Sequence, residues 1–490
     1  MLLTDLLTSL AVQEFIQNAI KKKMDALQIS TALNKAGYSN EDRAAIMDYM
    51  ALVPKFREKF FGEAGKKSDK FLLCDRLALE QSTAQDIGRY KANLWIAGLE
   101  SQGQKKEAEL VSHDASAPLN ASDSNFKDTK ARRPLVHDLC CGMGGDSYFI
   151  PETFDVCGID LDEDRQAMYR YNINVMRGSA GETILDDVRE VARRNSTEGA
   201  TSADASGSKR TADASGTKRT ADFFTIDPAR RTVEGENQRD LRNLTPSFEE
   251  VLEISRHYLG GMAKLPPGYP TDEIPQDAEL VYLGSHSDCR ELLVLFGTLA
   301  KNPGKVRAIM VDKNGETVRD AGGAPAEWSG TLTEIQAASN KDAEHDLPGC
   351  ERSFRNATSE SDLPVGEVAS FIAEPTALLI RSHLFGNVAL AAAPDAHLIN
   401  EGIAYVSCNS PLPAPAFANF QVIDSCEIST SAVRSMLKQH NVGKLTLKLR
   451  GVKVDPDEEI KRLKPKGKNS AILFYTRHNG EKIAILASRV

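Results

Sequence analysis

The sequence lacks the features that mark several specialised classes of protein. Its eight cysteines form no CxxC pair, so neither a zinc site nor a disulfide framework is indicated. No run of about 18 apolar residues is present, and the first residues have neither a basic lead nor a cleavage site. We therefore expect no membrane span and no secretion signal. The net charge of −9 gives the chain as a whole no attraction for nucleic acid. These absences predict a metal-free protein with reduced thiols in the cytoplasm.

The sequence does have the balance of a globular protein of two to four domains, with 490 residues of which 41% are hydrophobic and 26% charged. Apolar residues recur at helical spacing in the first 100 residues, and short apolar runs alternate with helical patterns after residue 134. This alternation predicts the α/β fold class with a mostly parallel sheet. The predicted organisation is a helical domain (1–100), a polar linker (101–133), an α/β domain (134–313), a second polar linker (314–365) and an α+β domain (366–490). A tandem repeat, ADASGSKRT followed by ADASGTKRT, predicts a disordered insert at about 195–221.

The first predicted strand of the α/β domain leads into a glycine-rich turn, HDLCCGMGGDS. Asp138 precedes this turn, Gly142 and Gly144 lie in it, and the next predicted strand ends in Asp160. In an open α/β sheet, ligands bind at the carboxyl ends of the strands, where glycines let the backbone approach the ligand. An acid at the end of the second strand is placed to accept both hydroxyls of a ribose. The pattern therefore predicts a cofactor that contains a nucleoside.

Two cofactors fit this pattern. A dinucleotide requires GxGxxG, and Ser147 stands where the third glycine would be. S-Adenosylmethionine has cationic sulfonium and amino groups, so an acid such as Asp138 beside the loop suits it, and the sequence favours this cofactor.

After the third predicted strand, Asp187 or its neighbour Asp186 is placed to accept a hydrogen bond from the adenine amino group. A helix N-cap explains these acids equally well.

The fourth predicted strand ends in an acid, a proline and two arginines, in the stretch DFFTIDPARR. With the cofactor along the first three strands, its methyl group points towards Asp227 and Pro228. Their carboxylate and carbonyl can hold the N–H bonds of an exocyclic amino group and aim its lone pair at the methyl carbon. Arg230 and Arg231 can meet a phosphate or carboxylate of the substrate, and Lys264 lines the pocket edge. The alternative is a turn with solvated arginines. The enzymatic interpretation fails if side chains plug the crevice, or if the Asp227 carboxylate is turned away and tied up in an internal ion pair.

The chain resembles class I S-adenosylmethionine-dependent methyltransferases that end in a THUMP-like domain. The resemblance rests on HDLCCGMGGDS, CGIDLD, FTIDPARR, KLPPG, IAEPTALLI, IAYVSCNSPLP, KLTLKLRGVKVDPDEE, FREKFF and LALEQSTAQDIGRYKA. The glycine loop is also similar to that of trimethylguanosine synthases, which methylate the exocyclic N2 of guanine in RNA. The resemblance implies a Rossmann-like methyltransferase domain with an N-terminal helical domain and a C-terminal α+β THUMP-like domain. It also implies RNA, typically tRNA, as partner, and S-adenosylmethionine held by Asp138, Cys140, Gly142, Gly144, Asp160 and Asp187.

Two motifs depart from the family's pattern, at three positions. Cys140 stands where the first glycine of the loop is expected. In the acceptor motif [DN]PP[YFW], Ala229 and Arg230 replace the second proline and the aromatic residue. Stacking on an aromatic residue contributes ~1–3 kcal/mol per base, so it must come from elsewhere, or the acceptor is not a base.

Two regions outside the α/β domain also carry expectations. Residues 443–468 hold nine Lys and Arg against four acids, and we expect Lys448 and Arg450 among them to bind substrate phosphates. Near the N-terminal helices, Ser82 or Thr83 is expected to cap a helix, with closure over the cofactor or substrate, which the resemblance implies, as the second interpretation. Lys91 is expected on a solvated face.

The predicted function is transfer of a methyl group from S-adenosylmethionine to RNA, at a base nitrogen of tRNA or another structured RNA. One alternative is a methyltransferase for a protein or a small molecule. The other is a non-catalytic RNA-binding protein with a vestigial site. The oligomeric state does not follow from the sequence.

Overall fold

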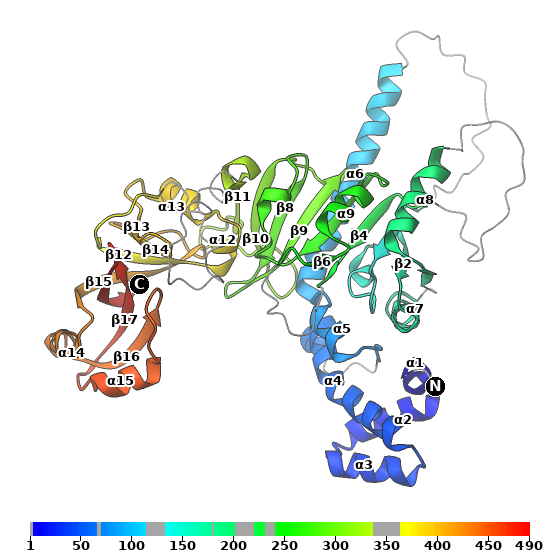
Figure 1. Ribbon diagram of the computed structural model, residues 1–490, viewed down its shortest axis with the longest axis horizontal. Coiled ribbons are helices and arrows are strands. Elements are labelled where there is room, and N and C mark those ends of the chain that lie inside the picture. Colours follow the sequence, from blue (N-terminus) through cyan, green and yellow to red (C-terminus); the bar gives the residue numbers. More distant parts are fainter. Residues whose placement is uncertain are drawn as a thin grey trace, which may run out of the picture.

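The structure is a computed structural model that describes residues 3–65, 70–113, 133–178, 181–200, 220–230, 241–336 and 363–490. The chain forms a helical N-terminal part, a central part around a large sheet, and a C-terminal part around a second sheet (Figure 1). The repeat predicted as a disordered insert lies almost entirely outside the described residues, as does Arg231.

The N-terminal part is all helical, as predicted, and its buried core includes Val12, Ile16 and Phe56. Its last helix continues to His113, so the predicted linker is helical over 101–113. That helix packs against the central sheet, because Trp95 lies edge-on to Phe223 with 6.0 Å between ring centroids. The helices are α1 (Leu3–Thr8), α2 (Leu10–Lys21), α3 (Ala26–Lys35), α4 (Asn40–Gly65), α5 (Arg76–Gln81) and α6 (Gln85–His113).

The central part has nine strands in the order β11-β10-β8-β9-β7-β4-β1-β2-β3. The strands are β1 (Leu135–Leu139), β2 (Asp155–Asp160), β3 (Glu182–Leu185), β4 (Phe223–Ile226), β7 (Gly260–Leu265), β8 (Glu279–Gly284), β9 (Cys289–Gly297), β10 (Lys305–Met310) and β11 (Glu327–Thr331). A separate pair is formed by β5 (Ala229–Arg230) and β6 (Leu244–Thr245). The helices are α7 (Glu163–Arg177), α8 (Val188–Ala200) and α9 (Phe248–Ser255), with short 3-10 turns at Ser147–Phe149 and Thr271–Glu273.

The strand order of this sheet reverses between β1 and β4. The chain places β2 and β3 on one side of β1, then returns to add β4 and β7 in parallel on the other side. Such a reversal opens a crevice outside the carboxyl ends of the strands. The predicted α/β class is confirmed, and the glycine turn after β1 lies at this crevice.

Two strands of the sheet were not predicted. β9 is an antiparallel strand between β7 and β8, and its apolar run fits a helix as well as a strand. β11 pairs with β10 at the edge of the sheet but lies within 314–365. The prediction of a linker is therefore wrong for residues 327–331, where a half-exposed edge strand has too few apolar residues to be recognised.

The C-terminal part is an α+β unit around a seven-stranded sheet in the order β13-β14-β12-β15-β18-β17-β16. Helix α12 packs on β8, β9 and β10, and one apolar core contains Tyr282 of β8 together with Leu378 and Val406. The C-terminal sheet is thus fixed to the central sheet through a shared core. The elements are β12 (Phe371–Pro375), α12 (Ala377–Arg381), α13 (Phe385–Ala392), β13 (His397–Asn400), β14 (Ile403–Cys408), β15 (Phe417–Glu427), α14 (Thr430–Gln439), β16 (Val442–Leu449), α15 (Pro456–Leu463), β17 (Asn469–His478) and β18 (Glu481–Arg489).

Candidate active site

The turn after β1 adopts a backbone conformation that favours glycine. Gly142 and Gly144 have φ angles of +51° and +85°, in the left-handed region that L side chains rarely adopt. Cys140 has φ +61°, also in the left-handed region. The backbone at this position therefore has a conformation that suits the glycine of the family's pattern. A Cβ atom added at Gly142 would meet no atom within 4 Å, so the space above this part of the loop is open.

Asp160 closes the glycine loop from the end of β2. Its Oδ2 accepts a hydrogen bond from the Gly142 N–H at 3.1 Å, and its Oδ1 accepts one from the Asp162 N–H at 3.1 Å. A carboxylate oxygen has capacity for a second donor, so both oxygens can still accept hydrogen bonds. This geometry suits the two hydroxyls of a ribose.

Asp138 lies beneath the loop and is only 4% exposed. Its Oδ2 accepts a hydrogen bond from the Ser147 hydroxyl at 2.7 Å, and the Ser147 oxygen lies 2.8 Å from the Tyr169 hydroxyl. Burial, and then the nearby Asp146 carboxylate, raise the pKa of Asp138 well above its usual range. Asp138 therefore has an internal partner, and its contact with a cofactor stays a prediction.

Asp187 precedes the first residue of helix α8. Its Oδ1 accepts a hydrogen bond from the Arg189 backbone N–H at 2.9 Å, as an N-cap residue does. The Arg189 guanidinium also pairs with this carboxylate, with 2.5 Å between Nη2 and Oδ2, and it lowers the pKa of Asp187. Asp186 pairs with Arg194 at 2.5 Å. The capping role is present, and an adenine contact by Asp187 stays a prediction.

Asp227 lies at the end of β4, with 35% of its side chain exposed. Its Oδ2 accepts a hydrogen bond from Lys264 Nζ at 2.7 Å, and Lys264 also donates to the Gln81 carbonyl at 2.8 Å. The internal ion pair that could undermine the enzymatic interpretation is therefore present, but it engages only Oδ2. No described residue donates a hydrogen bond to Oδ1, so one oxygen remains an available acceptor. Pro228 follows and is buried, while the side chain of Arg230 lies outside the described residues.

A buried ionic network joins the N-terminal helices to the crevice. Lys91 of α6 is 3% exposed, and its Nζ lies 2.5 Å from Asp146 Oδ1 and 3.4 Å from Glu291 Oε2. The Thr83 hydroxyl lies 2.7 Å from the same Asp146 oxygen and 3.1 Å from Glu291 Oε1. Lys264 Nζ is 3.9 Å from Glu291 Oε1. The network thus connects the end of the glycine loop to β9, β7 and the tip of β4.

The N-terminal segment contradicts two expectations. Lys91 is not on a solvated face. Burial lowers its pKa, but Asp146 and Glu291 raise it more, so Lys91 keeps its charge. The side chains of Ser82 and Thr83 do not cap a helix N-terminus, because Ser82 donates to the Leu79 carbonyl and Thr83 engages the two acids. Closure of this segment over the cofactor or substrate, the second interpretation, stays a prediction.

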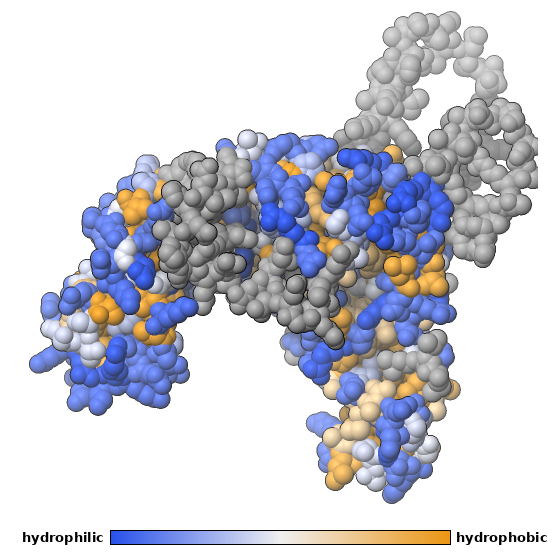
Figure 2. Space-filling view, viewed as in Figure 1, coloured by the Kyte–Doolittle hydropathy of each residue, from blue (hydrophilic) through white to orange (hydrophobic). Residues whose placement is uncertain are grey.

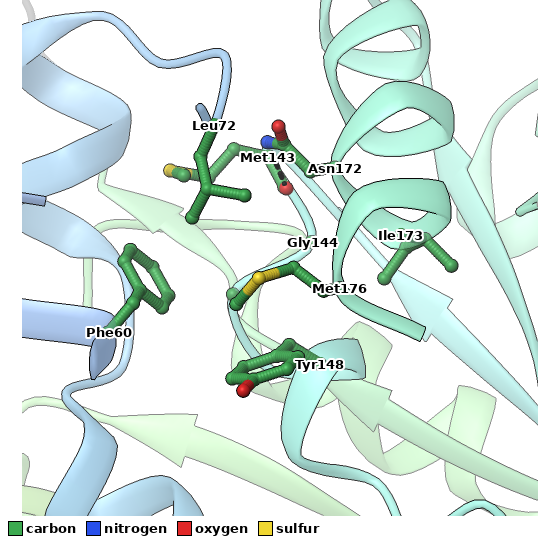
Figure 3. A pocket seen from close by; sticks show the side chains of 9 residues that line it. Phe60, Leu72, Met143, Gly144, Tyr148, Asn172, Ile173 and Met176 are labelled. Carbon is green, nitrogen blue, oxygen red and sulfur yellow. Dashed lines mark hydrogen bonds between the residues drawn. The ribbon is translucent and has the colours of Figure 1, made fainter. Parts of the chain in front are cut away.

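The back of the glycine loop packs against the N-terminal helices. Figure 3 shows Phe60 and Leu72 facing Met143 of the loop, and the contact leaves about 10 Å³ of free space. That volume suits about one water molecule, so this contact is closely packed. Asn172 of α7 holds the seam together, because its Nδ2 donates to the carbonyls of Leu73 at 2.8 Å and Met143 at 2.9 Å. The open face of the loop is therefore the one above Gly142.

The two basic residues predicted to bind phosphate in the C-terminal part share one acid. Lys448 Nζ and Arg450 Nη2 both contact Glu374, the latter at 3.1 Å, and the Arg450 guanidinium lies 4.7 Å from the Tyr405 ring centroid. Phosphate contact by these two residues stays a prediction. The surface over β16 and α15 is predominantly hydrophilic (Figure 2). Other basic residues of 443–468 are exposed there: Lys444, Lys453, Lys461, Arg462, Lys464, Lys466 and Lys468.

The described part of the chain carries no cluster of metal ligands, no membrane-crossing helix and no disulfide. Among them, no three or more His, Cys, Asp or Glu side chains gather as a metal site would require. No described helix combines the length and apolar character needed to cross a bilayer. The seven cysteines that the structure describes are free thiols.

Comparison with known proteins agrees with this architecture. Residues 418–489 match a family model described as THUMP domain-like. The chain is 23% identical over 349 residues to an uncharacterised S-adenosylmethionine-dependent methyltransferase of Mycobacterium tuberculosis, a match that covers 70% of this chain and 77% of the relative. A crystal structure from Porphyromonas gingivalis W83, named as a methyltransferase, has the same fold, with a TM-score of 0.61 at 18% identity over 98% of both chains. The domain match at 418–489, the relative and the shared fold thus support the class I S-adenosylmethionine-dependent methyltransferase with a C-terminal THUMP-like domain that the sequence predicted.

Proposed function

We propose that the protein transfers the methyl group of S-adenosylmethionine to a base nitrogen of RNA in the cytoplasm, with tRNA or another structured RNA as substrate. The observation that carries the proposal is the position of Asp227 and Pro228. They follow β4, which pairs in parallel with β1, so they lie at the carboxyl edge next to the glycine loop. Asp160 ends β2 on the other side of β1. A cofactor at the loop and an acceptor at Asp227 therefore meet at the strand reversal.

The residues around the glycine loop fit S-adenosylmethionine. Both oxygens of Asp160 have capacity for a ribose hydroxyl, and the backbone of Gly142 faces open space. The cofactor supplies a methyl carbon bonded to a positively charged sulfur, which makes that carbon electrophilic. Asp138, Cys140, Gly144 and Asp187 complete the proposed cofactor site.

Asp227 and Pro228 orient the acceptor in this proposal. An exocyclic amino group on a base is a poor nucleophile, because its lone pair is delocalised into the ring. Oδ1 of Asp227 and the Pro228 carbonyl accept hydrogen bonds from the two N–H groups of this amino group. These contacts keep its lone pair directed at the methyl carbon. Such orientation can contribute up to ~7–11 kcal/mol to the lowering of the barrier.

Lys264 supports this geometry by holding Asp227 in place. Burial lowers the pKa of Lys264, but the carboxylates of Asp227, Glu291 and Asp146 raise it more, so its net shift is upward. The ammonium group therefore stays charged at neutral pH and cannot act as a base. It fixes Oδ2 of Asp227 and leaves Oδ1 for the substrate.

RNA is the proposed substrate for two reasons. Residues 418–489 match a THUMP-like family model, and this resemblance implies RNA as partner. The exposed basic residues of 443–468 lie in that domain and can neutralise phosphates. If about five phosphates are neutralised, the logarithm of affinity falls against the logarithm of salt concentration with a slope of about −3.5 to −4.5.

The direct test is transfer of tritiated methyl groups from S-adenosylmethionine to total tRNA and, separately, to total cell protein. We expect tritium in the tRNA, and digestion of that tRNA to nucleosides should release the tritium in a methylated nucleoside. Asp227→Ala should lower turnover by about 10²–10³-fold with unchanged cofactor affinity, because it removes a preorganised polar contact to the acceptor. Asp277→Ala is the matched control, since Asp277 is exposed and precedes β8 at the opposite edge of the sheet. Label in protein alone would contradict the proposal.

A further inference from the structure

A cavity of about 350 Å³ lies where the central and C-terminal parts meet. The turn between β8 and β9 contributes His286 and Ser287 to its lining. Arg381 at the end of α12 also lines it, together with Glu374 of β12 and Arg450, which follows β16. Because the two parts share an apolar core through α12, these groups are held in fixed positions relative to one another.

The lining of this cavity has more positive than negative charge. Glu374 is the carboxylate in the lining, and it already contacts two cations, Arg450 and the adjacent Lys448. The Arg381 side chain is half-buried, and its guanidinium forms no hydrogen bond or ion pair with the residues that the structure describes. A guanidinium group carries five N–H donors in a planar fork that matches the oxygens of a phosphate. The cavity thus presents a charged donor group that has no partner of its own.

The cavity lies at the same edge of the sheet as Asp227. β8 is antiparallel to β9, which is antiparallel to β7, so β8 runs in the direction of β7 and β4. The turn at Ser287 follows the carboxyl end of β8, three strands from β4, which is roughly 14 Å at ~4.8 Å per strand. Arg381 also reaches the loop after β7, because a Cβ atom added at Gly268 would lie 3.0 Å from Arg381 Nη1.

We propose that this cavity binds a phosphate group of the RNA substrate through Arg381, with Arg450 and the Ser287 hydroxyl as further donors. The inference rests on the proposed function, since it concerns how the RNA is placed for methyl transfer. A phosphate anchored at this distance holds the neighbouring part of the RNA strand against the crevice, so that the acceptor base reaches Asp227. Glu374 has a positioning role, because it keeps Arg450 and Lys448 at the rim.

The test uses the full chain and measures binding of fluorescein-labelled total tRNA at several NaCl concentrations, with S-adenosylmethionine affinity measured in parallel. Arg381→Gln should weaken tRNA binding about tenfold and reduce the salt slope by about one. Ser287→Asp should weaken binding in the same way, and it alters an exposed turn residue that tolerates substitution. Arg256→Gln is the control with the same loss of charge, because Arg256 is 72% exposed and precedes β7 at the opposite edge. All three variants should keep wild-type cofactor affinity.

Equal tRNA affinities and salt slopes for Arg381→Gln, Ser287→Asp and Arg256→Gln would overturn the proposal. A second arm measures binding of inorganic phosphate. If Arg381→Gln abolished phosphate binding and left tRNA binding unchanged, the cavity would serve a small phosphate ligand, and the proposal would also be wrong. Failure of the proposed function is a separate result, namely that the wild-type chain transfers no methyl group to RNA.

Discussion

Replacement of Lys91 by methionine should destabilise the contact between helix α6 and the central sheet by about 3–5 kcal/mol. The side chain of Lys91 is 4% exposed, and its removal leaves Asp146 and Glu291, which are 13% and 7% exposed, without their closest cation. Loss of one partner from a buried ion pair costs this much because an uncompensated charge remains in the interior. The Thr83 hydroxyl still contacts both acids, and this limits the loss.

Urea unfolding followed by the fluorescence of Trp95 measures this effect, because Trp95 lies on α6 and contacts Phe154 and Phe223 of the central part. A Trp328→Phe background removes the second tryptophan. The double variant Lys91→Met with Glu291→Gln should lose less free energy of unfolding than the sum of the losses in the two single variants. The difference, which is the coupling energy of the two residues, should be about 0.5–3 kcal/mol. Arg256→Met, which breaks an exposed pair with Glu253, is the control and should cost about 0–1 kcal/mol. A Lys91→Met cost no larger than that of the control would refute the buried network.

Three further predictions concern the first two strands of the sheet. Burial lowers the pKa of His137 from 6.5 to about 3, so the folded state excludes a proton that the unfolded chain binds below pH 6.5. Stability should therefore be fully present above pH 6.5 and fall by up to about 1.4 kcal/mol per pH unit towards pH 3, and urea midpoints of His137→Gln should show a shallower decline. Asp160→Ala should weaken S-adenosylmethionine binding by about 1.5–3 kcal/mol in calorimetric titration, and an unchanged affinity would exclude Asp160 from the cofactor site. Gly158→Ala should destabilise the fold by about 1–3 kcal/mol, because its Cβ atom would lie 2.8 Å from the Tyr169 ring; an unchanged melting temperature would contradict this contact.

Much of the central sheet could be predicted because a strand buried on both faces has a continuous apolar run. The runs at 223–226 and 280–283, for example, lie in β4 and β8. β9 could not be distinguished from a helix, since its run of apolar residues has neither period. β11 was missed because an edge strand that is half-exposed has few apolar residues.

The edge at which the candidate site lies could also be predicted, because Asp160 ends one strand and Asp227 follows another, and the carboxyl ends of these strands meet at one edge. The ion-pair partners of the acids around this site could not be predicted. Lys91 lies 55 positions from Asp146 and 200 from Glu291, and no local pattern connects residues so far apart. The pair between Lys264 and Asp227 spans 37 positions and depends on β4 and β7 being neighbours in the sheet. Such pairings follow from the tertiary fold, and they decide which carboxylate oxygens remain free for a ligand.

The most direct measurement of the central claim is mass spectrometry of RNA nucleosides from cells with and without this chain. The proposal predicts that one nucleoside methylated at a base nitrogen disappears without the chain. Wild-type protein should restore it, and Asp227→Ala should not. If cells that lack the chain kept an unchanged set of methylated nucleosides, the claim that this protein methylates RNA would be contradicted.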